Sequence, residues 1–423
     1  MTAEETELMR DAGDERPQAG GADLAPQQSF IRRQSHSTVK PPTAEERARA
    51  RAELDKAIQV VKDASVAPNT RRAYESDLRQ FQKWRAGFLD HEKVDWGVVA
   101  KEPTPPASVQ EVIDYLFYKS TVLRKDGSPR YSPASMGRWI AALNWVHAQN
   151  NQPQPGLAPE VKQMIAGLRR LNRRPPRRAD PLMLDGLRSM LLSLDLKRYP
   201  GGVKATRDAA VVLFAFVGAM RRSEVGELRL RNVKRHPADG LHLRIESSKT
   251  DQAGRGAVLA LPYGANSVTC APCAFARWYR VRAAAIEGRS ALMATLRLQN
   301  VAIHICQEEL AFTLPTGVRV DAVIPSHEPL FPAMARGGII QDRAMSGAAV
   351  SDLIKLRGKQ AGLDTTFLSG HSPRSGFVTE GFRAGATSQE IMRQGRWTSV
   401  AMLEVYQRES NPLAGNAISK IAL

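Results

Sequence analysis

The chain has 423 residues, of which 43% are hydrophobic, so it is long enough for two domains with separate cores. Lysine and arginine number 60 against 43 aspartate and glutamate residues, and the net charge of +17 favours a polyanionic partner, most often nucleic acid, over a merely soluble basic protein. No apolar run of about 18 residues or apolar signal core is present, and three cysteines indicate a reducing compartment without a disulfide framework.

The N-terminal part of the chain predicts a tail followed by a helical domain. Residues 1–42 are rich in glycine, glutamine, serine and proline and are expected to form a disordered tail. Residues 43–172 are helical in pattern, and Ser132 followed by proline is a typical helix start. One predicted helix shows an apolar face made of Tyr74, Leu78, Phe81 and Trp84.

Residues 173–180 form a basic linker, because two prolines prevent a helix there. The linker is either a solvated connection or a segment that crosses a phosphate backbone. The positive charge of the whole chain favours the second interpretation. The candidate DNA-binding residues of this linker are Arg173, Arg174, Arg177 and Arg178.

Residues 181–423 predict a second domain that ends in a C-terminal tail. Alternation over 241–247 and 257–261 indicates two strands of a β-hairpin, with Lys249 in the turn between them. The segment 287–329 is hard to assign and suggests an insertion, and helices are expected to dominate after it. The whole chain is therefore predicted to be mostly α with a small β-hairpin or sheet, an α+β fold.

The C-terminal region holds residues suited to phosphate chemistry. In Gly-His-Ser-Pro-Arg, Ser372 is expected to cap a helix, which places Arg374 in a first turn where free N–H groups and the helix dipole favour an anion. His371 lies just ahead of that turn. One short helix after Trp397 would bring Tyr406 back to this anion site.

Two further candidates lie upstream, in Met-Arg-Arg-Ser-Glu-Val and Ser-Ser-Lys-Thr. The first contains Arg221 and Glu224, with Arg222 as a neighbouring rival for the role of Arg221, and the second contains Lys249. Each piece alone is more often structural, as a surface ion pair, a core tryptophan or a half-buried tyrosine. Their order and spacing together favour an enzyme that cuts DNA covalently.

Together these motifs resemble the tyrosine recombinase (phage integrase) family, and specifically its Cre-like members, which have tryptophan at Trp397 where most members have histidine. The resemblance covers about residues 50–423 and implies an all-helical core-binding domain followed by a tyrosine-recombinase catalytic domain. It further implies that Glu224 holds Arg221 and His371 through ion pairs. The implied catalytic residues are Arg221, Glu224, Lys249, His371, Arg374, Trp397 and the nucleophile Tyr406.

The chemistry implied by this resemblance is transesterification of DNA. Tyr406 attacks a phosphodiester to give a 3′-phosphotyrosine and a free 5′-OH, while Arg221 and Arg374 bind the non-bridging oxygens and Trp397 donates its N–H to one of them. Lys249 would protonate the leaving oxygen. Since the covalent link keeps the bond energy, no ATP, metal or other cofactor is expected.

The resemblance also implies double-stranded DNA as the partner and a homotetramer that joins two sites through a Holliday junction. A cytoplasmic protein of the bacterial cytoplasm or nucleoid is expected, with no membrane partner. Two alternatives remain, namely a type IB topoisomerase that relaxes DNA as a monomer and a DNA-binding protein that has lost catalysis.

The pair Cys270-x-x-Cys273 has the spacing of half a zinc-binding motif. Zinc usually requires four ligands, and the chain offers no second cysteine pair, only Cys306 with His304 two residues before it. We therefore expect small apolar cysteines near a helix start and no metal site.

Overall fold

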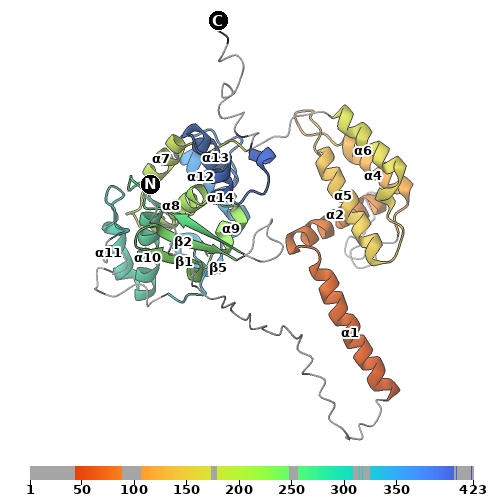
Figure 1. Cartoon of the computed structure of the whole chain (residues 1–423), viewed down its shortest axis with the longest axis horizontal. Coiled ribbons are helices and arrows are strands. Elements are labelled where there is room, and N and C mark those ends of the chain that lie inside the picture. Colours follow the sequence, from red (N-terminus) through yellow and green to blue (C-terminus); the bar gives the residue numbers. More distant parts are fainter. Residues whose placement is uncertain are drawn as a thin grey trace, which may run out of the picture. The chain divides into compact units, whose positions relative to one another are not determined.

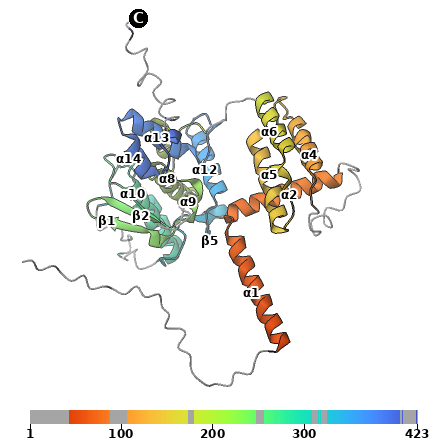
Figure 2. The same ribbon diagram turned by 45° about the vertical axis from the view of Figure 1, so that its right-hand side comes forward.

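The computed structural model divides the chain into two compact units, Met1–Arg174 and Pro175–Leu423 (Figures 1 and 2). No helix within the described ranges is both long and apolar enough to cross a membrane. The predicted tail at 1–42 and the arginines of the predicted linker lie outside the described residues. The structure describes residues 43–87, 106–172, 179–246, 256–307, 314, 317, 324–403, 406 and 421.

The first unit is helical in its described part, as predicted. Ser132 caps one of its helices by accepting the backbone N–H of Ser135 at 3.2 Å. The most N-terminal helix extends away from the other four, and its described side chains are exposed (Figure 1). The helices are α1 (Ala44–Ala64), α2 (Pro68–Gly87), α4 (Val109–Thr121), α5 (Pro133–Gln149) and α6 (Pro159–Leu171).

Aromatic rings from three helices form the core of the first unit. The ring centroids of Phe81 and Tyr115 are 5.1 Å apart, and those of Tyr115 and Trp139 are 5.6 Å apart. Lys119 is buried beside them, with its Nζ 5.3 Å from the Tyr115 centroid. Burial lowers the pKa of Lys119, and contact with the negative faces of the rings offsets part of that cost.

The second unit is built around the buried helix α8. Its residue Phe214 is fully buried, with ring centroids of Phe275 and Phe331 at 6.3 and 5.3 Å. The helices of this unit are α7 (Leu184–Leu192), α8 (Gly201–Val217), α9 (Arg222–Glu227), α10 (Ala271–Glu287), α11 (Arg289–Arg297), α12 (Gly347–Gln360), α13 (Ser372–Arg383) and α14 (Ser388–Gly395).

Two small antiparallel sheets complete the second unit. The predicted hairpin is present as β2 and β3, with Ile245 opposite Ala257, and a polar strand before it extends the sheet to the order β1-β2-β3. Helices dominate after residue 329 as expected, but the strands β4 and β5, which were not expected, also pair there. The strands are β1 (Val233–His236), β2 (Gly240–Ile245), β3 (Ala257–Leu261), β4 (Pro332–Met334) and β5 (Ile340–Ala344).

A buried ion-pair network fixes α8 to α12. The carboxylate of Asp208 is fully buried and accepts from Arg207 at 2.7 and 3.0 Å. Arg357 of α12 donates to the other carboxylate oxygen at 2.6 and 2.9 Å. Because α8 leads directly into the turn that carries Arg221, this network sets the position of that turn.

Replacing Asp208 by alanine should destabilise the protein by about 3–5 kcal/mol, since two buried guanidinium groups then lose their anion. Urea denaturation followed by near-ultraviolet circular dichroism measures the loss. Asp185, which pairs with Arg188 at 3.5 Å with its side chain 96% exposed, gives the control: Asp185→Ala should cause no measurable change. Equal effects of both substitutions would contradict this account.

Candidate active site

The first part of the site is the turn between α8 and α9. Arg221 immediately precedes α9, and Glu224 is the third residue of that helix. Glu224 reaches back to accept the backbone N–H of Arg221 at 2.9 Å, which is half of a capping box. Its other oxygen accepts from the Arg221 guanidinium at 2.7 Å. One carboxylate thus fixes both the backbone and the side chain of Arg221.

Arg396 is the second partner of Glu224. Its Nη2 donates to the carboxylate at 2.5 Å, so Glu224 is paired with Arg221 and Arg396 rather than with His371 as expected. Arg396 was not among the predicted site residues. Arg396 follows α14 and has a left-handed backbone conformation, with φ +57°. No sequence pattern predicts this conformation. Its position beside Trp397 in a predicted motif was, however, a usable signal.

The second part of the site is the start of α13. The cap of this helix is His371 rather than Ser372, because α13 begins at Ser372 and Pro373 is its second residue. Proline fits either of the first positions, where no intrahelical N–H bond is needed, so the sequence signal did not distinguish the two. Arg374 still lies in the first turn, as predicted.

Arg374 is held deep in the unit. It is 1% exposed and donates to the carbonyl oxygen of Ala219 and, at 2.6 Å, to that of Gly395. Burial and the charge of Arg221 lower the pKa of Arg374 to about 9. The site therefore holds more positive charge than its protein anions neutralise.

Trp397 packs against Arg374 in this arginine cluster. The ring centroid of Trp397 lies 3.7 Å from Cζ of Arg374, a cation–π contact in a desolvated setting. A side chain at position 395 would collide with the indole, which is why glycine stands at the end of α14. The indole thus supports a guanidinium, whereas its predicted N–H contact to phosphate remains a prediction.

Tyr406 lies against the edge of the same cluster. Its hydroxyl is 3.2 Å from Nε2 of His371, and its half-buried ring packs on an apolar group that includes Trp397 and Leu403. Partial burial, followed by the charges of Arg374 and Arg221, lowers the pKa of His371. A lowered pKa favours the neutral imidazole, which in the tautomer protonated at Nδ1 can accept a proton at Nε2.

Arg222, the rival of Arg221, has a different hydrogen-bond partner from Glu224. Its guanidinium donates to Oγ of Ser351 at 3.2 Å, and the same oxygen accepts the backbone N–H of Gly370 at 2.8 Å. Arg222 thus supports the loop ahead of His371 and leaves the pairing with Glu224 to its neighbour.

Gln394 is a second residue that sequence reasoning missed. Its side-chain amide donates to the carbonyl oxygen of Val217 at 2.9 Å and to that of Ala260 at 3.0 Å, which ties α14 to the end of α8 and to β3. Lys249 belongs to the connection between β2 and β3, which lies outside the described residues. The linker arginines lie outside them as well.

The chain was compared with known proteins. No family model matches it. An integrase/recombinase xerD homolog from Selenomonas ruminantium is 24% identical over 359 residues, 85% of this chain and 87% of that protein. Recombinase cre from Escherichia phage P1 is 23% identical over 316 residues, 73% and 78% of the two chains. The solved Tn1549 transposon integrase in complex with transposon right end DNA covers 85% of this chain and 98% of its own at 12% identity, with a TM-score of 0.46.

The curated similarity extends over most of both relatives. The fold brings six residues of the expected catalytic set together in one site, and Glu224 is one of them. The chain is thus similar over most of its length to two curated proteins named as recombinases.

Proposed function

We propose that this protein is a site-specific DNA recombinase that cleaves and rejoins double-stranded DNA through a covalent bond to Tyr406. The observation that carries the proposal is the 3.2 Å approach of the Tyr406 hydroxyl to His371, beside a cluster of arginines. The two curated relatives, named as recombinases, support the same activity. The geometry pairs a nucleophile with a neutral base at a site for an anion.

The arginines bind the scissile phosphate in this proposal. Three guanidinium groups, of Arg221, Arg374 and Arg396, lie near one carboxylate, and Nε and Nη1 of Arg396 have no hydrogen-bond partner among the described residues. A phosphodiester would neutralise the excess charge and accept such donors. The Arg221 side chain, 22% exposed, makes the first contact, since Arg374 is almost fully buried.

Cleavage then proceeds as an in-line exchange of two oxygen atoms at phosphorus. The phenol oxygen of Tyr406 forms a bond to phosphorus while its proton passes to Nε2 of His371. The bond from phosphorus to the 5′-oxygen breaks, and Lys249 gives that oxygen a proton, leaving a 3′-phosphotyrosine and a free 5′-OH. Attack by a 5′-OH on the phosphotyrosine reverses these steps and rejoins the strand.

We further propose that four copies join two DNA sites and exchange strands through a Holliday junction, with the linker arginines on the phosphate backbone. The linker would contribute a salt-dependent, sequence-independent part of the affinity. A type IB topoisomerase would show the same covalent chemistry without dependence on sequence. A protein that only binds DNA would form no covalent complex.

Tyr406→Phe should bind DNA like the wild type yet form no covalent complex, because only the attacking oxygen is removed. A nicked suicide substrate and a denaturing gel measure the complex, and a series of DNA sequences separates recombinase from topoisomerase. Tyr263→Phe is the matched control. Among the described residues, the Tyr263 hydroxyl donates to the carbonyl oxygen of His236 at 3.1 Å, outside the candidate active site. A covalent adduct formed by Tyr406→Phe would place the nucleophile elsewhere.

Lys249→Ala should slow cleavage of ordinary DNA by about 10²–10⁴-fold, the usual effect of losing a positioned acid. A substrate with sulfur as the 5′-bridging atom should restore the rate, because sulfur leaves without a proton. Single-turnover kinetics on both substrates measure this, with exposed Lys234 of β1 replaced by alanine as the control. Equal slowing on both substrates would exclude Lys249 as the acid.

The rate of covalent complex formation should remain high below the usual histidine pKa of about 6.5, because His371 must be neutral and its pKa is lowered. Arg222→Gln removes one of the charges that lower it, so the acidic limb of the rate profile should move to higher pH. Single-turnover rates across pH test both statements. A limb that does not move in Arg222→Gln would rule out His371 as the titrating base.

A further inference from the structure

All three cysteines of the chain come together at one place in the second unit. Cys270 and Cys273 lie at the start of α10, while Cys306 follows α11, and His304 lies beside them. The three thiol sulfurs and a ring nitrogen of His304 all lie within 4.8 Å of one another. The structure thus places Cys306 and His304 beside the pair Cys270 and Cys273, which the sequence alone did not indicate.

The distances match those of a tetrahedral zinc site. With Zn–S bonds of about 2.3 Å and a Zn–N bond of about 2.0 Å, two sulfurs should be about 3.8 Å apart and a sulfur and nitrogen about 3.5 Å apart. Here Sγ of Cys270 and Cys306 are 3.7 Å apart. Nδ1 of His304 lies 3.3 Å from Sγ of Cys273 and 4.0 Å from that of Cys306.

Two of the sulfurs accept hydrogen bonds from the backbone. The backbone N–H groups of Gly264 and Ile305 donate to the sulfurs of Cys270 and Cys273 at 3.4 and 3.3 Å. Nε2 of His304 faces the carbonyl oxygen of Ala265 at 3.4 Å, the outer contact typical of a metal-bound histidine.

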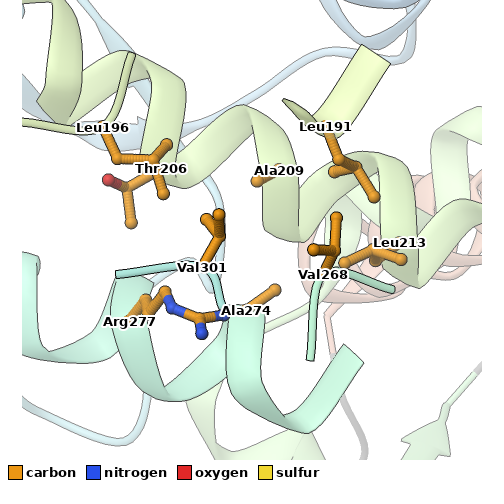
Figure 3. A pocket seen from close by; sticks show the side chains of 9 residues that line it. All are labelled: Leu191, Leu196, Thr206, Ala209, Leu213, Val268, Ala274, Arg277 and Val301. Carbon is orange, nitrogen blue, oxygen red and sulfur yellow. The ribbon is translucent and has the colours of Figure 1, made fainter. Parts of the chain in front are cut away.

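The segment that supplies two of these groups is already fastened to α10 by other contacts. Arg277 of α10 donates to the carbonyl oxygens of Asn300 and Ile303 at 3.0 and 2.7 Å. Figure 3 shows Arg277 and Val301 together at the adjoining apolar cavity between α8 and α10, whose volume of about 10 Å³ leaves room for about one water. The cavity is therefore too small to be a ligand site. The cluster of three cysteines and His304, in contrast, is well formed.

We propose that Cys270, Cys273, His304 and Cys306 bind one structural zinc ion. Four protein ligands leave no open position, so the ion would stabilise the fold and take no part in DNA cleavage. It would join the start of α10 to the segment after α11, within the region that the sequence suggested to be an insertion. This inference does not depend on the proposed recombinase activity.

Metal analysis of the full chain, purified under reducing conditions without chelators, tests the proposal. Mass spectrometry of the elements should find about one zinc per chain, and X-ray absorption should show about 2.3 Å Zn–S and about 2.0 Å Zn–N distances. Cys306→Ser and His304→Gln should each lower the zinc content, and cobalt in place of zinc should show the thiolate charge-transfer bands of a tetrahedral site.

The matched control is His242→Asn, which alters the other described group of metal-type side chains, His236, Asp239 and His242. This variant should keep its zinc, and its loss there would assign the ion to that group instead. Circular dichroism of each variant separates loss of zinc from loss of fold. Wild-type protein that carries no zinc, and whose reduced form binds no cobalt, would overturn the proposal. So would a disulfide between Cys270 and Cys306 in the freshly purified protein.

Discussion

The carboxylate of Glu224 is the interaction on which the candidate active site depends. The Glu224 residue is 5% exposed, and its carboxylate pairs with Arg221, which immediately precedes α9, and with Arg396, which follows α14. These two elements are far apart in the sequence, and the guanidinium groups would repel each other without a shared anion. Glu224 therefore determines how close the two segments lie, and Arg374 and Trp397 pack into the space that remains.

This arrangement leaves the site short of negative charge. Burial of Arg374 beside Arg221 lowers its pKa to about 9, so keeping the group charged is costly in the absence of an anion. Two nitrogens of Arg396 are also unsatisfied among the described residues. An apolar replacement would often be more stable than such a cluster. In the proposed function a bound phosphate would restore the charge balance, so the feature that weakens the free protein would favour the complex.

Local signals in the sequence predicted much of this fold. Helical periodicity, the Ser132 cap and the alternation over β2 and β3 depend on nearby residues, and they were correct. Strand β1 was missed because it is short and mostly polar, and β4 with β5 was missed because proline, glycine and charged residues mask their pairing.

The site could be predicted by residue type but not by pairing. Arg374 was placed correctly in a first helical turn, yet the partner of Glu224 depends on where a left-handed residue turns after α14, which is a tertiary property. The convergence of Cys273 and Cys306 has the same origin, since a chain reversal through α11 brings them together. Long-range closure of this kind leaves no periodic trace in the sequence.

The side-chain amide of Gln394 has a mechanical consequence for the whole site. Its amide nitrogen donates to the carbonyl oxygens of both Val217 and Ala260. Gln394 itself lies two residues before Arg396 in the chain. The Gln394 side chain therefore links two parts of the site. One is β3, the strand that follows the Lys249 connection, and the other is the segment that carries Arg396 and Trp397. A displacement of β3 would therefore be transmitted through Gln394 to the segment that carries Arg396 and Trp397.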